Sequence, residues 1–207
     1  MKKIGILIFD DVEVLDFCGP FEVFSSVRLD NDRHRESSSP YAVLLVAESE
    51  APIVTRGGME VRPQVTLASC PSLDLLVVPG GWGVREQLEN AATIEWIRQR
   101  AKQVSRLTSV CTGSMLLGEA GLLDGRRATT HWRSLDWMRE SFPAVRVVAD
   151  EHVVEDGDTV TSAGISAGID MALRMVARDF GDAVARETAA HMEYPYPTDN
   201  RRRVAMD

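Results

Sequence analysis

The chain has 207 residues, of which 44% are hydrophobic and 26% charged, and a formal net charge of −8 at pH 7. This length and balance predict one folded domain over residues 1–207 and exclude a disordered chain. The negative charge argues against nucleic acid as a partner, because the average surface repels a polyanion.

The first apolar run, residues 3–9, ends at Asp10-Asp11 and is too short for a signal peptide. No later segment has the length and apolar character of a membrane span. The three cysteines are widely spaced, so they do not form a disulfide framework and fit a reducing compartment. We therefore expect a cytoplasmic protein with no membrane partner.

Strand and helix signals alternate along the chain. In the first half they predict a strand at 3–9, a helix at 16–27 with Pro20 in a helix-starting position, a polar loop at 30–40, a strand at 41–47, a hairpin at 53–62, a strand at 75–78 and a helix at 84–104 that residues 90–93 could divide. In the second half they predict a strand at 107–110, a helix at 112–121, an extended piece at 128–130, a helix at 134–141, an extended piece at 145–148, a hairpin at 153–161 and helices at 166–180 and 182–192.

This alternation gives strand–helix–strand crossovers, and hence a mostly parallel sheet with helices on both faces. The predicted fold class is α/β, a flavodoxin-like three-layer sandwich. In such sheets a site forms outside the carboxyl ends of the strands. The loops that qualify are residues 10–20, 79–83 and 110–113.

Cys111 lies between a predicted strand and a predicted helix, and Thr112-Gly113-Ser114 allow a sharp turn there. The arrangement is similar to a nucleophile elbow with sulfur in place of oxygen. A helix N-terminus favours a thiolate, so the position predicts an acidic, nucleophilic cysteine. The alternative is a small cysteine that packs in the core.

Gly80-Gly81 follows another core strand, and glycine there allows the backbone to approach a ligand and direct an N–H at negative charge. The spacing matches no nucleotide-binding motif. Asp16, in the loop after the first strand, can reach the same edge of the sheet. It is either a protonated acid that moves protons for the thiol or the N-cap of the first helix.

His131, 20 residues after Cys111, is a candidate base or a packed structural residue. His191-Met192-Glu193 resembles the His-x-Glu of class I glutamine amidotransferases but lacks the usual proline, so we discount it. The four histidines are scattered, and we expect neither a metal site nor a cofactor.

Several segments together resemble the ThiJ/PfpI superfamily over nearly the whole chain. The segments that carry the resemblance are residues 15–23, 78–81, 110–114, 121–132 and 164–170. Within the superfamily the chain looks most like the isonitrile hydratases and the sensor domain of AraC-type regulators. Protease members usually have histidine after the nucleophile, where this chain has Thr112, which weakens a peptidase interpretation.

The resemblance implies that Cys111 is the nucleophile, that Asp16 is its acidic partner and that Gly81 belongs to the anion-stabilising backbone. It further implies that His131 and Ile165 lie near the site and that the protein is a homodimer. The backbone N–H of Thr112 is expected to contact the substrate.

The first functional hypothesis is the hydration of a small isonitrile to an N-substituted formamide. The alternatives are a redox or ligand sensor related to the regulators and a glyoxalase-like activity on small aldehydes. The final arginines, residues 201–203, are interpreted as a solvated tail that is too short to read DNA.

Overall fold

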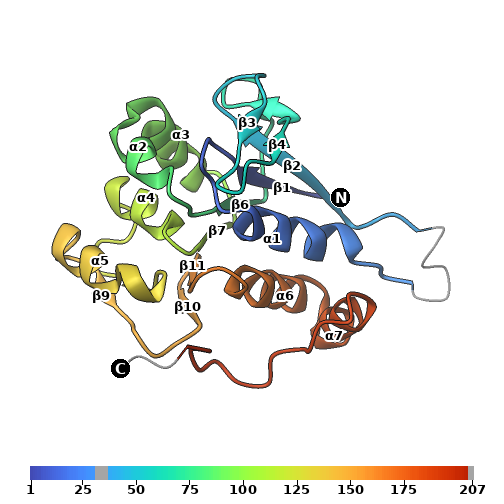
Figure 1. Cartoon of the computed structure of the whole chain (residues 1–207). Helices are drawn as coiled ribbons and strands as arrows, with labels where there is room; N and C mark the ends of the chain where they lie inside the picture. The colour runs from blue at the N-terminus through green and yellow to red at the C-terminus, as the bar shows by residue number, and fades with distance from the viewer. Residues whose placement is uncertain (31–36, 205–207) are drawn as a thin grey trace.

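The protein is described by a computed structural model that covers residues 1–30 and 37–204 of the chain (Figure 1). A seven-stranded sheet lies at the centre, in the order β10-β11-β7-β6-β1-β2-β5. The predicted loop at 30–40 lies mostly outside the described residues. Within the described residues, no helix combines the length and the apolar character that crossing a bilayer requires.

The middle of the sheet is parallel. Its strands are β1 (Lys2–Leu7), β2 (Tyr41–Ala47), β6 (Leu75–Val78), β7 (Arg106–Val110) and β11 (Thr159–Ser162). The side chains of β6 are all buried, as expected for a strand covered on both faces. The predicted core strands and the α/β sandwich are therefore confirmed.

The edges of the sheet are shorter. On one side β10 (Val153–Asp156) joins β11 in an antiparallel hairpin, whose turn contains Gly157 at φ 63°. On the other side β5 (Val65–Thr66) adds two residues that the sequence analysis did not predict. Outside the main sheet, β3 (Ile53–Val54) and β4 (Glu60–Val61) form the predicted hairpin, and β8 (Arg127–Ala128) pairs with β9 (Arg146–Val147).

Helices cover the sheet (Figure 1). Figure 1 shows α1 beside α6, α7 next to them, and α2, α3 and α4 grouped on the other side of the strands. Their bounds are α1 (Val14–Ser26), α2 (Val84–Glu89), α3 (Ala91–Ala101), α4 (Gly113–Glu119), α5 (Leu135–Ser141), α6 (Ala167–Phe180) and α7 (Asp182–His191), with a 3₁₀ turn, η1 (Trp132–Ser134), before α5.

Two details of the helices differ from or sharpen the sequence prediction. Pro20 lies inside α1 and not at its start, because the helix already begins at Val14. The predicted division of the long helical pattern occurs at Asn90. Its side chain accepts hydrogen bonds from the backbone N–H groups of Ala92 and Thr93, which starts α3 as a new helix.

The C-terminal arginines correct a third expectation. Arg202 is half-buried and hydrogen-bonds Ala149, Thr129 and Thr130. Arg203 forms an ion pair with the buried carboxylate of Asp170 at 3.2 Å. The interpretation as a solvated tail is therefore wrong for Arg202, because composition cannot show that a terminal segment has buried acceptors to bind, whereas the side chains of Arg201 and Arg203 are exposed.

Candidate active site

Cys111 follows β7 directly and adopts φ 56°, in the left-handed region that costs a non-glycine residue about 1–3 kcal/mol. Hydrogen bonds hold this conformation from both sides. The Cys111 N–H lies 3.2 Å from the carbonyls of Ser162 and Ala163, and the Cys111 carbonyl accepts the hydroxyls of Ser114 at 3.1 Å and Thr130 at 3.0 Å. The tight turn expected from the sequence is present, and it fixes the direction of the sulfur.

Glycines make room for this turn. A Cβ at Gly113 would lie 2.0 Å from the carbonyl oxygen of Val78, so α4 can approach β6 only with glycine there. A Cβ at Gly164 would lie 2.9 Å from Cys111 Sγ and 2.4 Å from His131 Cδ2. Gly164 therefore brings the sulfur and the imidazole to one small space.

Asp16 is fully buried in the first turn of α1. Its Oδ2 accepts the backbone N–H of Gly80 at 2.9 Å, while its Oδ1 has no hydrogen-bond partner among the described residues. The residue before α1 is Glu13, and Asp16 does not cap the helix. Of the two roles that the sequence left open for Asp16, the capping role is excluded.

The Asp16 carboxyl and the Cys111 thiol are close enough to shift each other's pKa. Burial raises the pKa of Asp16 well above its ordinary value, although the N–H of Gly80 opposes the shift. Burial also raises the pKa of Cys111, an ionised Asp16 would raise it further, and hydrogen bonds to Thr112 lower it. Both groups therefore tend to keep their protons.

This direction corrects the expectation of an acidic thiol. The sequence places Cys111 before a helix, where hydrogen bonding does lower its pKa, but it does not show that the side chain is only 6% exposed. Desolvation is the larger effect, because a thiolate in this space loses most of its hydration. Burial also raises the pKa of Cys18 and of Cys70, so the thiol that matters is distinguished by its neighbours and not by its acidity.

Thr112 and Gly81 bind each other. The N–H of Gly81 donates to Thr112 Oγ1 at 3.1 Å, and the same hydroxyl lies 3.4 Å from the Gly81 carbonyl. Gly81, at φ 130°, also forms a bridge with Val12. In this structure the Gly81 N–H thus donates to the Thr112 hydroxyl, and its expected role toward a developing negative charge stays a prediction. The neighbouring Gly80 N–H instead points at Asp16.

His131 is half-buried, and its pKa is lowered by burial and, to a smaller extent, by the positive charges of Arg202 and Arg133. Its Nδ1 accepts the N–H of Arg133 at 3.3 Å, which leaves the other ring nitrogen to carry the proton. Ile165 is half-buried in the turn between Gly164 and α6, where its carbonyl accepts the N–H of Gly168. His131 thus lies beside Cys111 at Gly164, and Ile165 directly follows Gly164 in the chain.

The aromatic residues around the site divide into two groups. Phe17 is 1% exposed and belongs to the core. Trp82 and Trp132 are 57% and 37% exposed and directly follow Gly81 and His131 in the chain.

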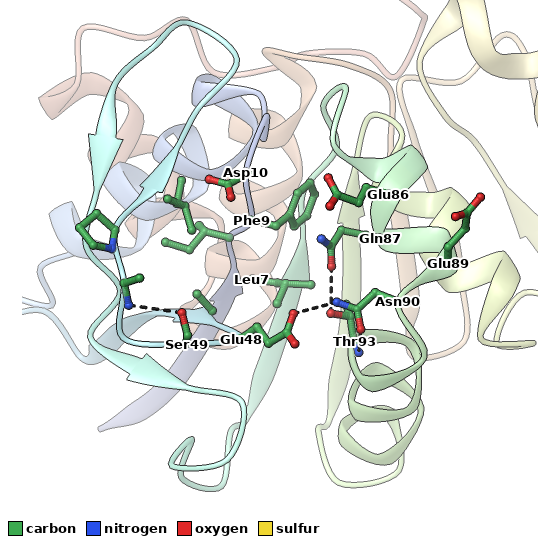
Figure 2. A pocket seen from close by; sticks show the side chains of 15 residues that line it. Leu7, Phe9, Asp10, Glu48, Ser49, Glu86, Gln87, Glu89, Asn90 and Thr93 are labelled. Carbon is green, nitrogen blue, oxygen red and sulfur yellow. Dashed lines mark hydrogen bonds between the residues drawn. The ribbon is translucent and has the colours of Figure 1, made fainter.

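A separate cavity of about 590 Å³ lies at the same edge of the sheet, outside the carboxyl ends of β1 and β2 (Figure 2). Its lining includes the carboxylates of Asp10, Glu48, Glu86 and Glu89 but neither Cys111 nor Asp16. Figure 2 shows the amide of Asn90 bonded to Glu48. Among the described residues, no group of three or more histidine, cysteine or acidic side chains is placed to hold a metal ion.

Comparison with known proteins adds to this geometry. A sequence model of the DJ-1/PfpI family matches residues 2–178. The chain is 38% identical to an isonitrile hydratase from Pseudomonas putida over 192 residues, which cover 93% of this chain and 78% of the relative. It is also 37% identical over 134 residues to the transcriptional regulator CdhR from Pseudomonas aeruginosa, of which it spans only 39%.

Solved structures agree with the fold. A ThiJ/PfpI family protein from Pseudomonas syringae superposes with a TM-score of 0.83 at 33% identity, over 96% of this chain and 78% of that one. An AraC family transcriptional regulator from Pseudomonas putida superposes with a TM-score of 0.77 at 19% identity, over 93% of this chain and all of that one. At that identity the second likeness concerns the fold alone.

Proposed function

The chain belongs to the DJ-1/PfpI family, and we propose that it is a cysteine-dependent hydratase of small isonitriles that uses Cys111 as nucleophile and Asp16 as proton carrier. The observation that carries this proposal is the buried pair itself. Asp16 is held by the N–H of Gly80 through Oδ2, and its carboxyl lies close enough to the Cys111 thiol for each group to shift the other's pKa. The likeness to an isonitrile hydratase at 38% identity supports the choice of substrate.

The proposed first step adds the thiol across the terminal carbon of the isonitrile. The sulfur forms a bond to this carbon, the Asp16 carboxyl gives its proton to the same carbon, and Asp16 takes up the thiol proton. The product is a thioimidate, in which Cys111 Sγ is bonded to a CH group that is double-bonded to nitrogen. Burial raises the pKa of both groups, and with both protonated at the start the step places no net charge in a desolvated space.

The proposed second step is the addition of water. The water oxygen bonds to the thioimidate carbon, and Asp16 relays one water proton to the nitrogen. The carbon–sulfur bond then breaks, the remaining hydroxyl proton returns to the sulfur, and an N-substituted formamide leaves. One isonitrile and one water give one formamide, and Cys111 and Asp16 regain their starting protonation.

The surrounding residues support this chemistry in different ways. Thr112, whose backbone and side chain both hydrogen-bond the sulfur, orients the nucleophile. The half-buried His131 and Ile165 border the space that the substrate nitrogen and its substituent occupy in the proposal. In the proposal, the exposed rings of Trp82 and Trp132 offer apolar surface to a small hydrophobic substituent.

Burial weighs against the alternative of a redox sensor. A sensor cysteine is usually accessible and has a low pKa, whereas Cys111 is 6% exposed and burial raises its pKa. We further propose that the protein acts in the cytoplasm as a homodimer on a small-molecule substrate, without a cofactor and without binding DNA.

The experiment that tests the proposed function is a product assay on the purified protein. Proton NMR with a small alkyl isonitrile is expected to show the matching N-substituted formamide, and methylglyoxal is expected to stay unchanged. Lactate from methylglyoxal without formamide from any isonitrile would favour the glyoxalase-like activity. Absence of both products, with a readily oxidised Cys111, would favour the sensor.

A further inference from the structure

The segment after α7 returns to the active-site end of the molecule. Figure 1 shows it running beneath α6 and back toward β10. Partly buried contacts fix it along the way. The Tyr194 hydroxyl donates to Asp170 at 2.8 Å, Arg203 pairs with the same carboxylate, and the Asn200 amide donates to the carbonyl of Val153 at 2.9 Å.

Arg202 in this segment reaches the strand end beside Cys111. Its Nε donates to the carbonyl of Ala149 at 2.5 Å, and its Nη2 donates to Thr129 Oγ1 at 2.6 Å and to the Thr130 carbonyl at 3.1 Å. No carboxylate lies within 4 Å of this guanidinium in the described part of the chain. The planar fork of arginine is thus used to hold backbone and hydroxyl oxygens in fixed positions.

The residues that Arg202 holds are the ones that contact the elbow. Thr130 Oγ1 donates to the Cys111 carbonyl at 3.0 Å, which supports the strained φ of Cys111. The next residue, His131, shares with Cys111 Sγ the space beside Gly164. Residues 129–131 are therefore bound on one side by Arg202 and on the other by Cys111.

We propose that Arg202 is a positioning residue of the active site, which sets the place of Thr130 and His131 relative to the sulfur. Its guanidinium does not touch the reacting atoms in this proposal and acts through the segment it holds. Its positive charge has a second consequence, because it adds to the effect of burial in lowering the pKa of His131. The inference rests on the proposed function only where turnover is the readout.

The test compares Arg202→Gln and Arg202→Lys with the neighbouring Arg201→Gln, which removes the same charge from an exposed side chain. Arg202→Gln is expected to lower kcat about tenfold or more with little change in KM, because misplacement of reacting groups slows chemistry more than binding. Arg202→Lys keeps the charge but loses the fork and should fall in between. Arg201→Gln should match the wild type.

The second readout needs no substrate. NMR titration of the His131 ring is expected to show a higher pKa in Arg202→Gln and a wild-type pKa in Arg201→Gln. If Arg202→Gln does not fold, as judged by thermal unfolding, Arg202→Lys and Thr130→Val carry the test. In Thr130→Val only the hydroxyl bond to Cys111 is removed, and kcat should again fall. Wild-type kcat and an unshifted His131 pKa in the folded Arg202 variants would overturn the proposal. A raised His131 pKa in Arg202→Gln, with no isonitrile turnover by any variant or by the wild type, would refute the proposed function alone.

Discussion

Two regions at the carboxyl edge of the same sheet differ in the burial and the hydrogen bonding of their acidic groups. In the cavity of about 590 Å³, the carboxylates of Asp10 and Glu48 are exposed and accept hydrogen bonds from Val54 N at 2.7 Å and Asn90 Nδ2 at 2.8 Å. At the elbow, Asp16 is fully buried and one of its oxygens has no partner in the described structure.

The difference shows that the largest hollow described here is not where the reactive groups are expected. A solvated, satisfied carboxylate costs little and gains little from its position, whereas a buried carboxyl with a free oxygen destabilises the fold and is retained for another reason. Perturbed groups of this kind gather at functional sites. The comparison predicts that variants at the elbow change turnover and that matched variants in the cavity do not.

The largest effect is expected for Cys111→Ala. If Cys111 is the nucleophile, as proposed, its removal should lower kcat by about 10⁴-fold or more. Glu48→Gln, which keeps an oxygen to accept the bond from Asn90, should retain the wild-type rate. Formamide production followed by NMR measures both. A cavity variant as inactive as the elbow variant would break the comparison.

Asp16→Asn should come next. Asparagine keeps the acceptor for Gly80 N–H but cannot carry a proton, so kcat should fall by about 10²–10⁴-fold. The control is Asp10→Asn, because Asp10 lies in the connection between β1 and α1 and its carboxylate also accepts a backbone N–H. The steady-state kcat of Asp10→Asn should match the wild type, so the two variants should differ by the whole fall in kcat expected for Asp16→Asn. Near-wild-type activity of Asp16→Asn would show that Asp16 is not the proton carrier.

The same Asp16 variant should gain stability. Burial raises the folded-state pKa of Asp16 above its unfolded value, which is about 3.9. The folded protein therefore keeps a proton that the unfolded chain releases, and stability falls as the pH rises above that unfolded value. Asparagine at this position does not ionise, so the variant does not lose this stability as the pH rises.

Thermal unfolding measures the gain. At pH 7 Asp16→Asn should unfold at a higher temperature, by about 2–4 °C for each kcal/mol of penalty removed. The difference should shrink as the pH is lowered toward about 4. A variant less stable than the wild type at pH 7, or a gain that grows in acid, would contradict the raised pKa.

Gly164→Ala should have a smaller effect on turnover. The added Cβ would lie close to both Cys111 Sγ and His131 Cδ2, and displacement of these groups by a fraction of an ångström should cost about 10–10²-fold in kcat/KM. Gly57→Ala is a matched control, because a Cβ there meets nothing within 4 Å. Equal activity of the two variants would show that the space beside the sulfur is not used.

Local signals sufficed to predict most of the fold and part of the site. The apolar strands, the hairpins and the break at Asn90 depend on neighbouring residues, and they appear where the sequence indicates. Cys111 could be located because a strand, a glycine turn and a helix follow one another there. The two-residue strand β5 has too little pattern to detect.

The features of the site that could not be predicted from the sequence depend on contacts between residues far apart in the chain. Nothing near Gly164 in the sequence shows that its missing side chain leaves space for Cys111 and His131, although the glycine lies in a segment that carries the family resemblance. Arg202 could not be separated from a solvated tail, because its acceptors lie 53, 72 and 73 residues away. The raised pKa of Cys111 likewise reflects burial that only the folded chain creates.

The most direct test of the central claim is a single-turnover experiment with enzyme in excess over isonitrile. The mixture is quenched in acid at short times, and the mass of the intact protein and of its Cys111 peptide is measured. Covalent attack predicts a transient increase equal to one isonitrile molecule on the Cys111 peptide, rising before the formamide and decaying as it forms. Formamide that accumulates with no adduct at any time, and at the same rate in Cys111→Ala, would contradict the account.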